Sequence, residues 1–166
     1  QEPNPKESMW YQEGMTRVNM AVGSAHQNPD GTNVVSASGL LNDGSDTVRV
    51  IAADMTLDRI SVIVNSFIEM HDAEAFLVDK DSSVILASRD SDLISKTLGA
   101  DGQSAFYKDV EKKVSGKSYD FCTLDGNMTV FKEVNGTNWL LVSYVPTNVV
   151  LADLVGLRNL MIIFSI

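Results

Sequence analysis

Apolar and polar residues follow one period from residue 47 to 54 and a different one from residue 57 to 70. Alternation of β-branched and small residues in the first segment predicts a half-buried strand that stops at Asp54. From Leu57 to Met70 the apolar residues recur at steps of three and four, which predicts a helix with one apolar side. Short apolar runs at 75–78 and 84–87 flank a polar turn and predict a hairpin. The helix is therefore expected to join two sheets.

Two sets of three strands are predicted, each preceded by a helix. The first helix is expected over Glu7–Val18 and the second over Gly102–Val114. Gly, Pro, Asn and Asp gather in the turns between the strands and favour tight reversals, so each set should form an antiparallel meander. The strands are expected at 19–26, 33–41 and 47–54 in the first set and at 118–124, 128–134 and 138–145 in the second.

The closing segment, Thr147–Ile166, becomes apolar on every side toward its end. This pattern predicts the first turns of a membrane-spanning helix, since a full span needs about 20 residues. The alternative is a buried C-terminal helix of a soluble protein. The polar start of the chain at Gln1 does not have the pattern of a signal peptide, and we interpret the chain as part of a longer polypeptide.

Composition excludes some classes of protein. The hydrophobic share of 44% is enough for a packed core, and the formal net charge of −9 argues against nucleic acid as a partner. Cys122 is the single cysteine, so no intramolecular disulfide and no cysteine-rich metal site is expected. Its position in an alternating run predicts a buried strand residue.

Several short segments, in this order and spacing, resemble one family. They are Trp10-Tyr11, the strand-to-helix exit at 50–57, the strand and turn at 75–81, the Asn-Gly-Thr-Asn-Trp strand at 135–142, and Val145-Pro146. Together they resemble the extracytoplasmic double Cache sensor domains of bacterial receptors, whose modules have a PAS-like fold. The resemblance implies an α+β fold of antiparallel sheets flanked by helices, with a membrane-distal and a membrane-proximal module in series.

The resemblance also implies a division of the chain. We expect residues 1–56 to form the C-terminal part of the distal module, 57–72 a linking helix, 73–146 the proximal module, and 147–166 a helix leading into the membrane. A complete distal module of this family begins with a long helix and a first strand ahead of Trp10. The distal module is therefore expected to be incomplete.

In amino-acid-sensing members of the family, a Trp-Tyr pair lines the ligand pocket. An arginine two residues before this pair binds the ligand's carboxylate, and an aspartate at the strand exit binds its ammonium group. The resemblance implies a ligand site of Trp10, Tyr11, His26 and Asp54. However, Ser8 occupies the arginine position, and His26 stands where a tyrosine is expected. The carboxylate clamp is absent, so the implied ligand is an amine or another small metabolite.

Each of these residues also has a purely structural explanation. Trp10 and Tyr11 lie at helical spacing and can be core aromatics, and Asp54 can accept a bond from the first amides of the following helix. His26 can be a surface histidine, because no second His or Cys lies at ligand spacing to complete a metal site. These alternatives stay open at the level of sequence.

Catalysis finds little support. The sequence has no glycine-rich phosphate loop, HExxH or GxSxG motif, and His71 has no partnered nucleophile. Asp79 and Asp81 occupy a predicted hairpin turn, where aspartates bond locally. We predict no catalytic residue, no metal and no cofactor.

The sequence thus predicts the extracytoplasmic ligand-sensing region of a bacterial transmembrane receptor. A small molecule bound in the distal module would be relayed through helices to a cytoplasmic output domain: a chemotaxis signalling domain, a histidine kinase or a cyclic-dinucleotide synthase. We expect the chain to lie at the cell membrane and to pair as a homodimer. The alternative is a protein-interaction or dimerisation module without a small ligand.

Overall fold

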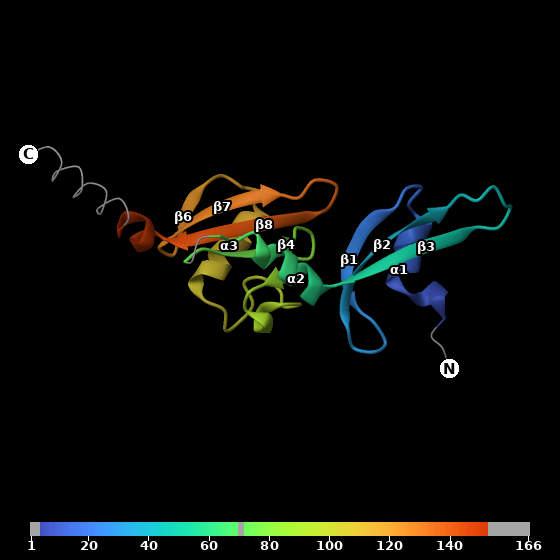
Figure 1. Ribbon diagram of the computed structural model, residues 1–166, viewed down its shortest axis with the longest axis horizontal. Coiled ribbons are helices and arrows are strands. Elements are labelled where there is room, and N and C mark those ends of the chain that lie inside the picture. Colours follow the sequence, from blue (N-terminus) through green and yellow to red (C-terminus); the bar gives the residue numbers. More distant parts are fainter. Residues whose placement is uncertain (1–3, 70–71, 153–166) are drawn as a thin grey trace, which may run out of the picture.

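The computed structural model describes residues 4–69 and 72–152. Two antiparallel sheets follow one another along an elongated chain and are joined by a helix, α2 (Leu57–Ser66), as Figure 1 shows. The first sheet has the order β1-β2-β3 and the second the order β5-β4-β8-β7-β6. The predicted α+β class with two antiparallel sheets is confirmed.

The first sheet consists of one meander. Its elements are a 3-10 turn η1 (Pro5–Glu7), α1 (Met9–Met15), β1 (Ala21–Gln27), β2 (Asn33–Leu41) and β3 (Arg49–Thr56). The predicted helix over Glu7–Val18 is shorter at both ends, because Ser8 is extended and Thr16 ends the helix by bonding the Glu13 carbonyl. The strand predicted to stop at Asp54 continues to Thr56.

Helix α1 lies very close to this sheet, and Gly14 makes the approach possible. A Cβ at Gly14 would stand 2.4 Å from Cγ1 of Val50 and 3.2 Å from Cβ of Ser38. The Glu13 carboxylate accepts a hydrogen bond from the Ser24 amide of β1 at 3.1 Å. Gly14 lowers the intrinsic stability of the helix, but the close packing of α1 against the sheet requires a glycine at this position.

Helix α2 begins at the end of β3. Thr56 is its N-cap, and the side-chain oxygen accepts a hydrogen bond from the Arg59 amide at 3.2 Å. Asp54 is thus not the helix-start acceptor. The predicted end of this helix at Met70 is wrong, because the helix ends at Ser66 in a tighter last turn. There the Phe67 amide donates to the Val64 carbonyl, and Ser66 Oγ donates to the Ile63 carbonyl.

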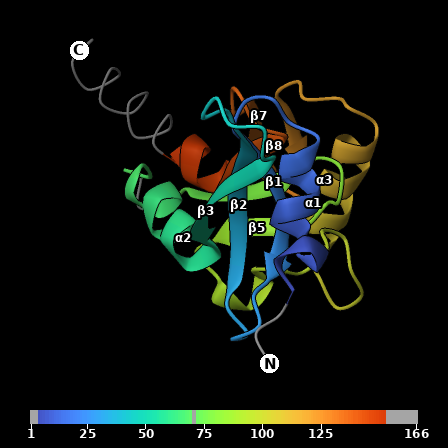
Figure 2. The ribbon, with the colours of Figure 1, turned by 90° about the vertical axis from the view of Figure 1, so that its right-hand side faces the viewer.

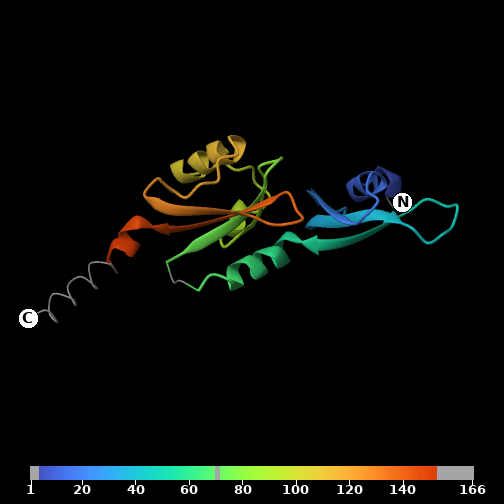
Figure 3. The same ribbon diagram turned by 90° about the horizontal axis from the view of Figure 1, so that it is seen from above.

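The second sheet is flanked by helices on its two faces. Figure 3 shows α3 on one side of it and α2 on the other. Between α3 and the sheet lies a cluster of fully buried side chains that includes Phe76, Val110, Leu140 and Val142. The elements are β4 (Glu74–Asp79), β5 (Ile85–Ser88), a 3-10 turn η2 (Ser91–Leu93), α3 (Ala105–Ser115), β6 (Cys122–Leu124), β7 (Asn127–Glu133) and β8 (Trp139–Pro146).

In the second sheet, the start of β6 and the burial of Cys122 differ from the sequence-based expectation, and the local bonding of Asp79 agrees with it. Strand pairing with β7 starts only at Cys122 and not at residue 118, because the chain leaves α3 through Lys117 at φ +50° and first crosses a loop. Cys122 itself is only half-buried. Asp79 bonds locally as expected, since its Oδ1 accepts from the Asp81 and Ser82 amides at 3.0 and 2.9 Å.

Leu57 lies at the junction of the two sheets. It is 1% exposed and packs in one cluster with Val35 of the first sheet and with Leu77 and Leu86 of the second. Figure 2, which looks along the long axis, shows α2 next to the end of β3, and Figure 3 shows the rest of the helix against the second sheet. The first turn of α2 therefore connects the two cores.

The element order repeats within the chain. The series α1-β1-β2-β3 leads into α2, and the series α3-β6-β7-β8 leads into a helical segment that is described from residue 147 to 152. The two leading helices start alike, with Ser-Met-Trp-Tyr at residues 8–11 and Ser-Ala-Phe-Tyr at residues 104–107. β8 pairs with β4 as well as β7, whereas β3 pairs only with β2 in the described residues.

The structure describes only the start of the segment that is predicted to lead into the membrane. Residues 147–152 are helical, and the remainder of Thr147–Ile166 lies outside the described residues. Within residues 4–69 and 72–152, no helix has the length and apolar character that crossing a membrane requires.

Candidate functional site

A chain of polar side chains crosses the first sheet near its junction with α2. Ser36 and Asp54 are directly opposite each other on β2 and β3, and Ser36 Oγ donates to Asp54 Oδ1 at 2.6 Å. Asn28, in the turn after β1, donates to Asp54 Oδ2 at 3.2 Å. His26 Nε2 lies 3.4 Å from Ser36 Oγ, and its Nδ1 lies 3.1 Å from the Ser24 carbonyl.

This network fixes the direction of the Asp54 carboxylate. Among the residues that the structure describes, each oxygen accepts one hydrogen bond, which leaves it a second lone pair. Ser36 is 1% exposed, whereas Asp54 is an exposed residue. The arrangement presents an oriented negative group to a cationic ligand at the surface of the sheet.

A cavity of about 600 Å³ adjoins the network. Its wall on one side is η1 and the start of α1, including Glu7, Ser8 and Trp10, and on the other side His26 and Asn28. The volume lies within the range of small-molecule sites, about 300–1,000 Å³. Among the described residues that line it, none is a lysine or arginine, so the cavity offers no cationic partner to a carboxylate.

The structure brings the four predicted site residues into one region, but to different degrees. Trp10 and His26 line the cavity. Asp54 does not line the cavity itself but accepts a hydrogen bond from Asn28, which does. Tyr11 packs edge-on against Trp10, with ring centroids 5.7 Å apart. Assignment of these four residues to a ligand site stays a prediction, although three of them share the cavity or its hydrogen-bonded wall.

Two members of the network, Ser36 and Asn28, were not singled out from the sequence. Ser36 lies in an apolar strand, and a serine at a buried strand position needs a partner, which points to the strand opposite it. Asn28 lies in a turn, where asparagine is common for local reasons. The strand register brings Ser36 to Asp54, and the path of the turn after β1 brings Asn28 there.

A second aromatic cluster occupies the equivalent place in the second sheet. Tyr144 lies two residues before the end of β8, as Asp54 does in β3, and Phe106 and Tyr107 of α3 correspond to Trp10 and Tyr11 of α1. The Phe106 and Tyr144 ring centroids are 4.4 Å apart. Tyr144 Oη donates to Glu74 Oε2 at 2.5 Å.

Burial governs the acidity of this cluster. Desolvation is the main cause that raises the pKa of Tyr144 far above its usual range, and the hydrogen bond with Glu74 raises it further. Burial also raises the pKa of Tyr107, and the neighbouring Tyr144 partly opposes this shift. Both phenols stay protonated at neutral pH.

Metal binding has no geometric support in this part of the chain. Within the described ranges, no group of three or more His, Cys, Asp or Glu side chains is placed to hold an ion.

Comparisons with known proteins find relatives at the level of structure. No family model matches the sequence, and no curated protein matches it. The extracellular domain of a candidate histidine kinase, mmHK1S-Z3, superposes over 92% of this chain and 58% of its own length, with a TM-score of 0.71 at 18% identity. The ligand-binding domain of the Pseudomonas aeruginosa amino acid chemoreceptor PctB, in complex with L-Arg, covers 95% of this chain and 62% of its own, with a TM-score of 0.64 at 22% identity.

The Pseudomonas fluorescens chemoreceptor CtaA, in complex with L-isoleucine, gives a similar result, with a TM-score of 0.62 at 18% identity over 92% of this chain and 62% of its own. The chain has the fold of these receptor ligand-binding domains. It spans about three fifths of their length. The PAS-like sensor fold expected from the sequence is confirmed, because the similar structures are an extracellular domain of a histidine kinase and ligand-binding domains of chemoreceptors.

Proposed function

We propose that the chain is the extracytoplasmic ligand-sensing region of a bacterial transmembrane receptor, and that it binds a small amine in the cavity beside Asp54. The cavity next to the Asp54–Ser36–Asn28 network carries the proposal. An ammonium group is matched by the oriented carboxylate, and Trp10 supplies an aromatic surface for the rest of the ligand. The sensor-domain fold supports the receptor role.

The proposed ligand lacks a carboxylate. No lysine or arginine lines the described part of the cavity, and Ser8 occupies the position at which amino-acid sensors of the resembled family carry an arginine. A carboxylate placed here would lose its hydration without gaining a positive partner. The residues that bind it are Trp10, His26 and Asp54, with Tyr11 supporting Trp10.

The route to the output runs through the helices. Residues 1–56 serve as the distal module, 57–72 as the link, 73–146 as the proximal module and 147–166 as the membrane-leading helix. Leu57 packs against both sheets, so a ligand-induced shift of β3 reaches the proximal core directly. The cytoplasmic output domain would be a chemotaxis domain, a kinase or a cyclase, outside this chain.

Matched ligand pairs test the proposal. Agmatine and phenethylamine are L-arginine and L-phenylalanine without their carboxylates, and all four are titrated into the chain by calorimetry and thermal shift. We expect binding by at least one amine and by neither amino acid. Asp54→Asn should abolish that binding, whereas Asp46→Asn, which removes the same charge on an exposed loop, should retain it. Equal binding of the amine by both variants would exclude Asp54 from the site.

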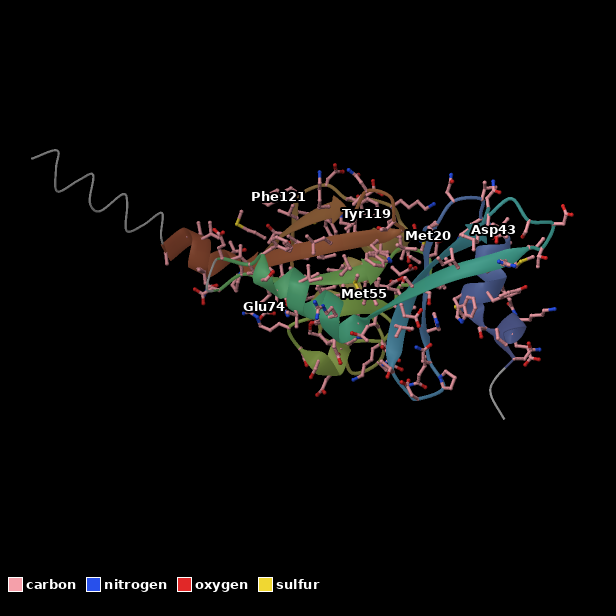
Figure 4. All side chains as sticks on the ribbon, turned by 45° about the vertical axis from the view of Figure 1, so that its right-hand side comes forward. Met20, Asp43, Met55, Glu74, Tyr119 and Phe121 are labelled. Carbon is pink, nitrogen blue, oxygen red and sulfur yellow. The ribbon has the colours of Figure 1, made fainter. Side chains whose placement is uncertain are left out.

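A specific surface favours a second candidate function, that of an interaction or dimerisation module. Apolar side chains are exposed along α2 and the end of β3, with Phe67 at 79%, Val62 at 69% and Met55 at 45%. Met55 lies where β3 runs into α2 (Figure 4). A groove of about 360 Å³ separates this side of α2 from β4 and β8. Such a surface is typical of a protein interface.

Sedimentation velocity separates the two candidates. A homodimer that Phe67→Ser converts to monomer, together with no stabilisation by any of the four compounds, would favour the interaction module. Amine binding by a variant that is monomeric would favour the sensor.

A further inference from the structure

The turn that joins β7 and β8 contains the only Asn-Gly pair in the sequence, Asn135-Gly136. Both residues are exposed, and Gly136 has φ +76°, which suits the third position of a tight turn. The Thr137 amide donates to the Val134 carbonyl at 3.2 Å and closes the turn. The pair is therefore held at both ends, while its own two residues stay exposed to water.

The reacting atoms of this pair are free. In the part of the chain that the structure describes, neither the Asn135 side chain nor the Gly136 amide takes part in a hydrogen bond. A Cβ at Gly136 would meet no atom within 4 Å, so the space beside this amide is open. Asn127 differs, because its Nδ2 donates to the Asp125 carbonyl at 3.1 Å and the side chain of Met128 follows it. Only at residue 135 is a free carboxamide followed by an unhindered amide.

An asparagine followed by glycine can lose ammonia through its own backbone, because no side chain on the glycine obstructs the approach. The Gly136 nitrogen gives its proton to solvent and attacks Cγ of Asn135. A C–N bond forms, the bond from Cγ to Nδ2 breaks, and the amide nitrogen takes a proton from solvent and leaves as ammonia. Water then opens the cyclic succinimide at either carbonyl and yields aspartate or isoaspartate. No electrons are transferred.

The turn lies at the junction between the two sheets. Val134 and Trp139, on either side of it, pack against the cluster that joins the sheets around Leu57. Figures 1 and 3 show the turn between β7 and β8 at the end of the second sheet that faces the first. Isoaspartate lengthens the backbone within this turn by one carbon atom, which is incompatible with the hydrogen bond from Thr137 that closes it. The reaction therefore changes the backbone next to the junction.

We propose that Asn135 is a site of spontaneous deamidation, at which aspartate and isoaspartate accumulate beside the junction of the two modules. The reaction consumes only water and adds one negative charge to a chain of net charge −9. The inference is independent of the proposed ligand, because no residue of this turn lines the cavity beside Asp54.

The test incubates the purified chain for several weeks at physiological temperature and mildly alkaline pH, followed by peptide mapping with mass spectrometry and an isoaspartate assay. We expect Asn135 to lose ammonia about tenfold faster than Asn127 or Asn138, which corresponds to about 1.4 kcal/mol in the barrier. The rate should rise with pH, because the attacking amide has to lose its proton. Asn135→Gln keeps a neutral carboxamide, but its longer side chain disfavours ring closure, so residue 135 should stay intact in this variant.

An Asn135 that stays intact, or that reacts no faster than Asn127, would overturn the proposal. The effect on the junction has its own measurement. A chain that contains isoaspartate should melt roughly 2–4 °C lower than the fresh chain, as the loss of one turn hydrogen bond predicts for this size. Asn135→Asp carries the new charge without the longer backbone and should melt like the unaltered chain. Unchanged melting of the isoaspartate form would refute the effect on the junction.

Discussion

Replacement of Leu57 by alanine tests whether the first turn of α2 joins the two cores. Leu57 is 1% exposed and packs with Val35 on one side and with Leu77, Leu86 and Ala87 on the other. Removing a buried leucine side chain costs about 2–5 kcal/mol, from lost burial and from the cavity left behind. Because strands surround this position on both sides and can relax little, we expect Leu57→Ala to lower the free energy of unfolding by about 3 kcal/mol.

Urea denaturation followed by circular dichroism measures the loss, and a thermal scan should show a decrease in Tm of about 6–12 °C for a chain of this size. The matched control is Val62→Ala on the same helix. Val62 is 69% exposed, so its replacement should change the free energy of unfolding by no more than about 0.5 kcal/mol. A loss below 1 kcal/mol for Leu57→Ala, or equal losses for the two variants, would refute the idea that Leu57 connects the sheets.

Two further predictions concern packing and ionisation. Gly14→Ala should destabilise the chain by about 1–3 kcal/mol in the same urea assay, because the new methyl group would stand 2.4 Å from Cγ1 of Val50 and force α1 away from the sheet; unchanged stability would show that α1 has room to move. The raised pKa of Tyr144 means that the folded state keeps a proton which the unfolded state loses near pH 10, so stability is intact below that pH and falls above it. The free energy of unfolding then falls by at most about 1.4 kcal/mol per pH unit, and by less where water still reaches the hydroxyl. In thermal melts at pH values from roughly 9.5 to 11.5, stability should decrease less steeply with pH in Tyr144→Phe than in the unaltered chain. An identical decrease in both proteins would contradict the attribution of this pH dependence to Tyr144.

The order of helices and strands could be predicted from the sequence because it depends on local periodicity. Alternation in the strands and three- and four-residue steps in α2 reflect which side chains are buried, and each period belongs to one backbone geometry. The Asp-Gly and Asn-Gly turns adopt positive φ at Asp125, Gly126 and Gly136, as such hairpins require. These features need no knowledge of distant contacts.

Helix ends were less predictable, because side-chain bonds decide them. The apolar stripe of α2 continues beyond Ser66, yet Ser66 Oγ turns back to the Ile63 carbonyl and the helix stops. Likewise, Thr56 and not Asp54 accepts the bond from the Arg59 amide. Several residues near each end offer a suitable oxygen, and only the geometry selects one of them.

By itself the sequence determined the class of fold and the series of elements, whereas the candidate site residues Trp10, Tyr11, His26 and Asp54 came from its resemblance to a known family and stay a prediction. Only the tertiary structure decided that Ser36 and Asn28 hold Asp54, and that the cavity beside them has no cationic lining in the described residues. The physical reason is that backbone periodicity is encoded within a few neighbouring residues. Cavities and hydrogen-bond partners instead depend on strand register and helix placement, which bring together residues 26 positions apart, as in Asn28 and Asp54, or 70 positions apart, as in Glu74 and Tyr144.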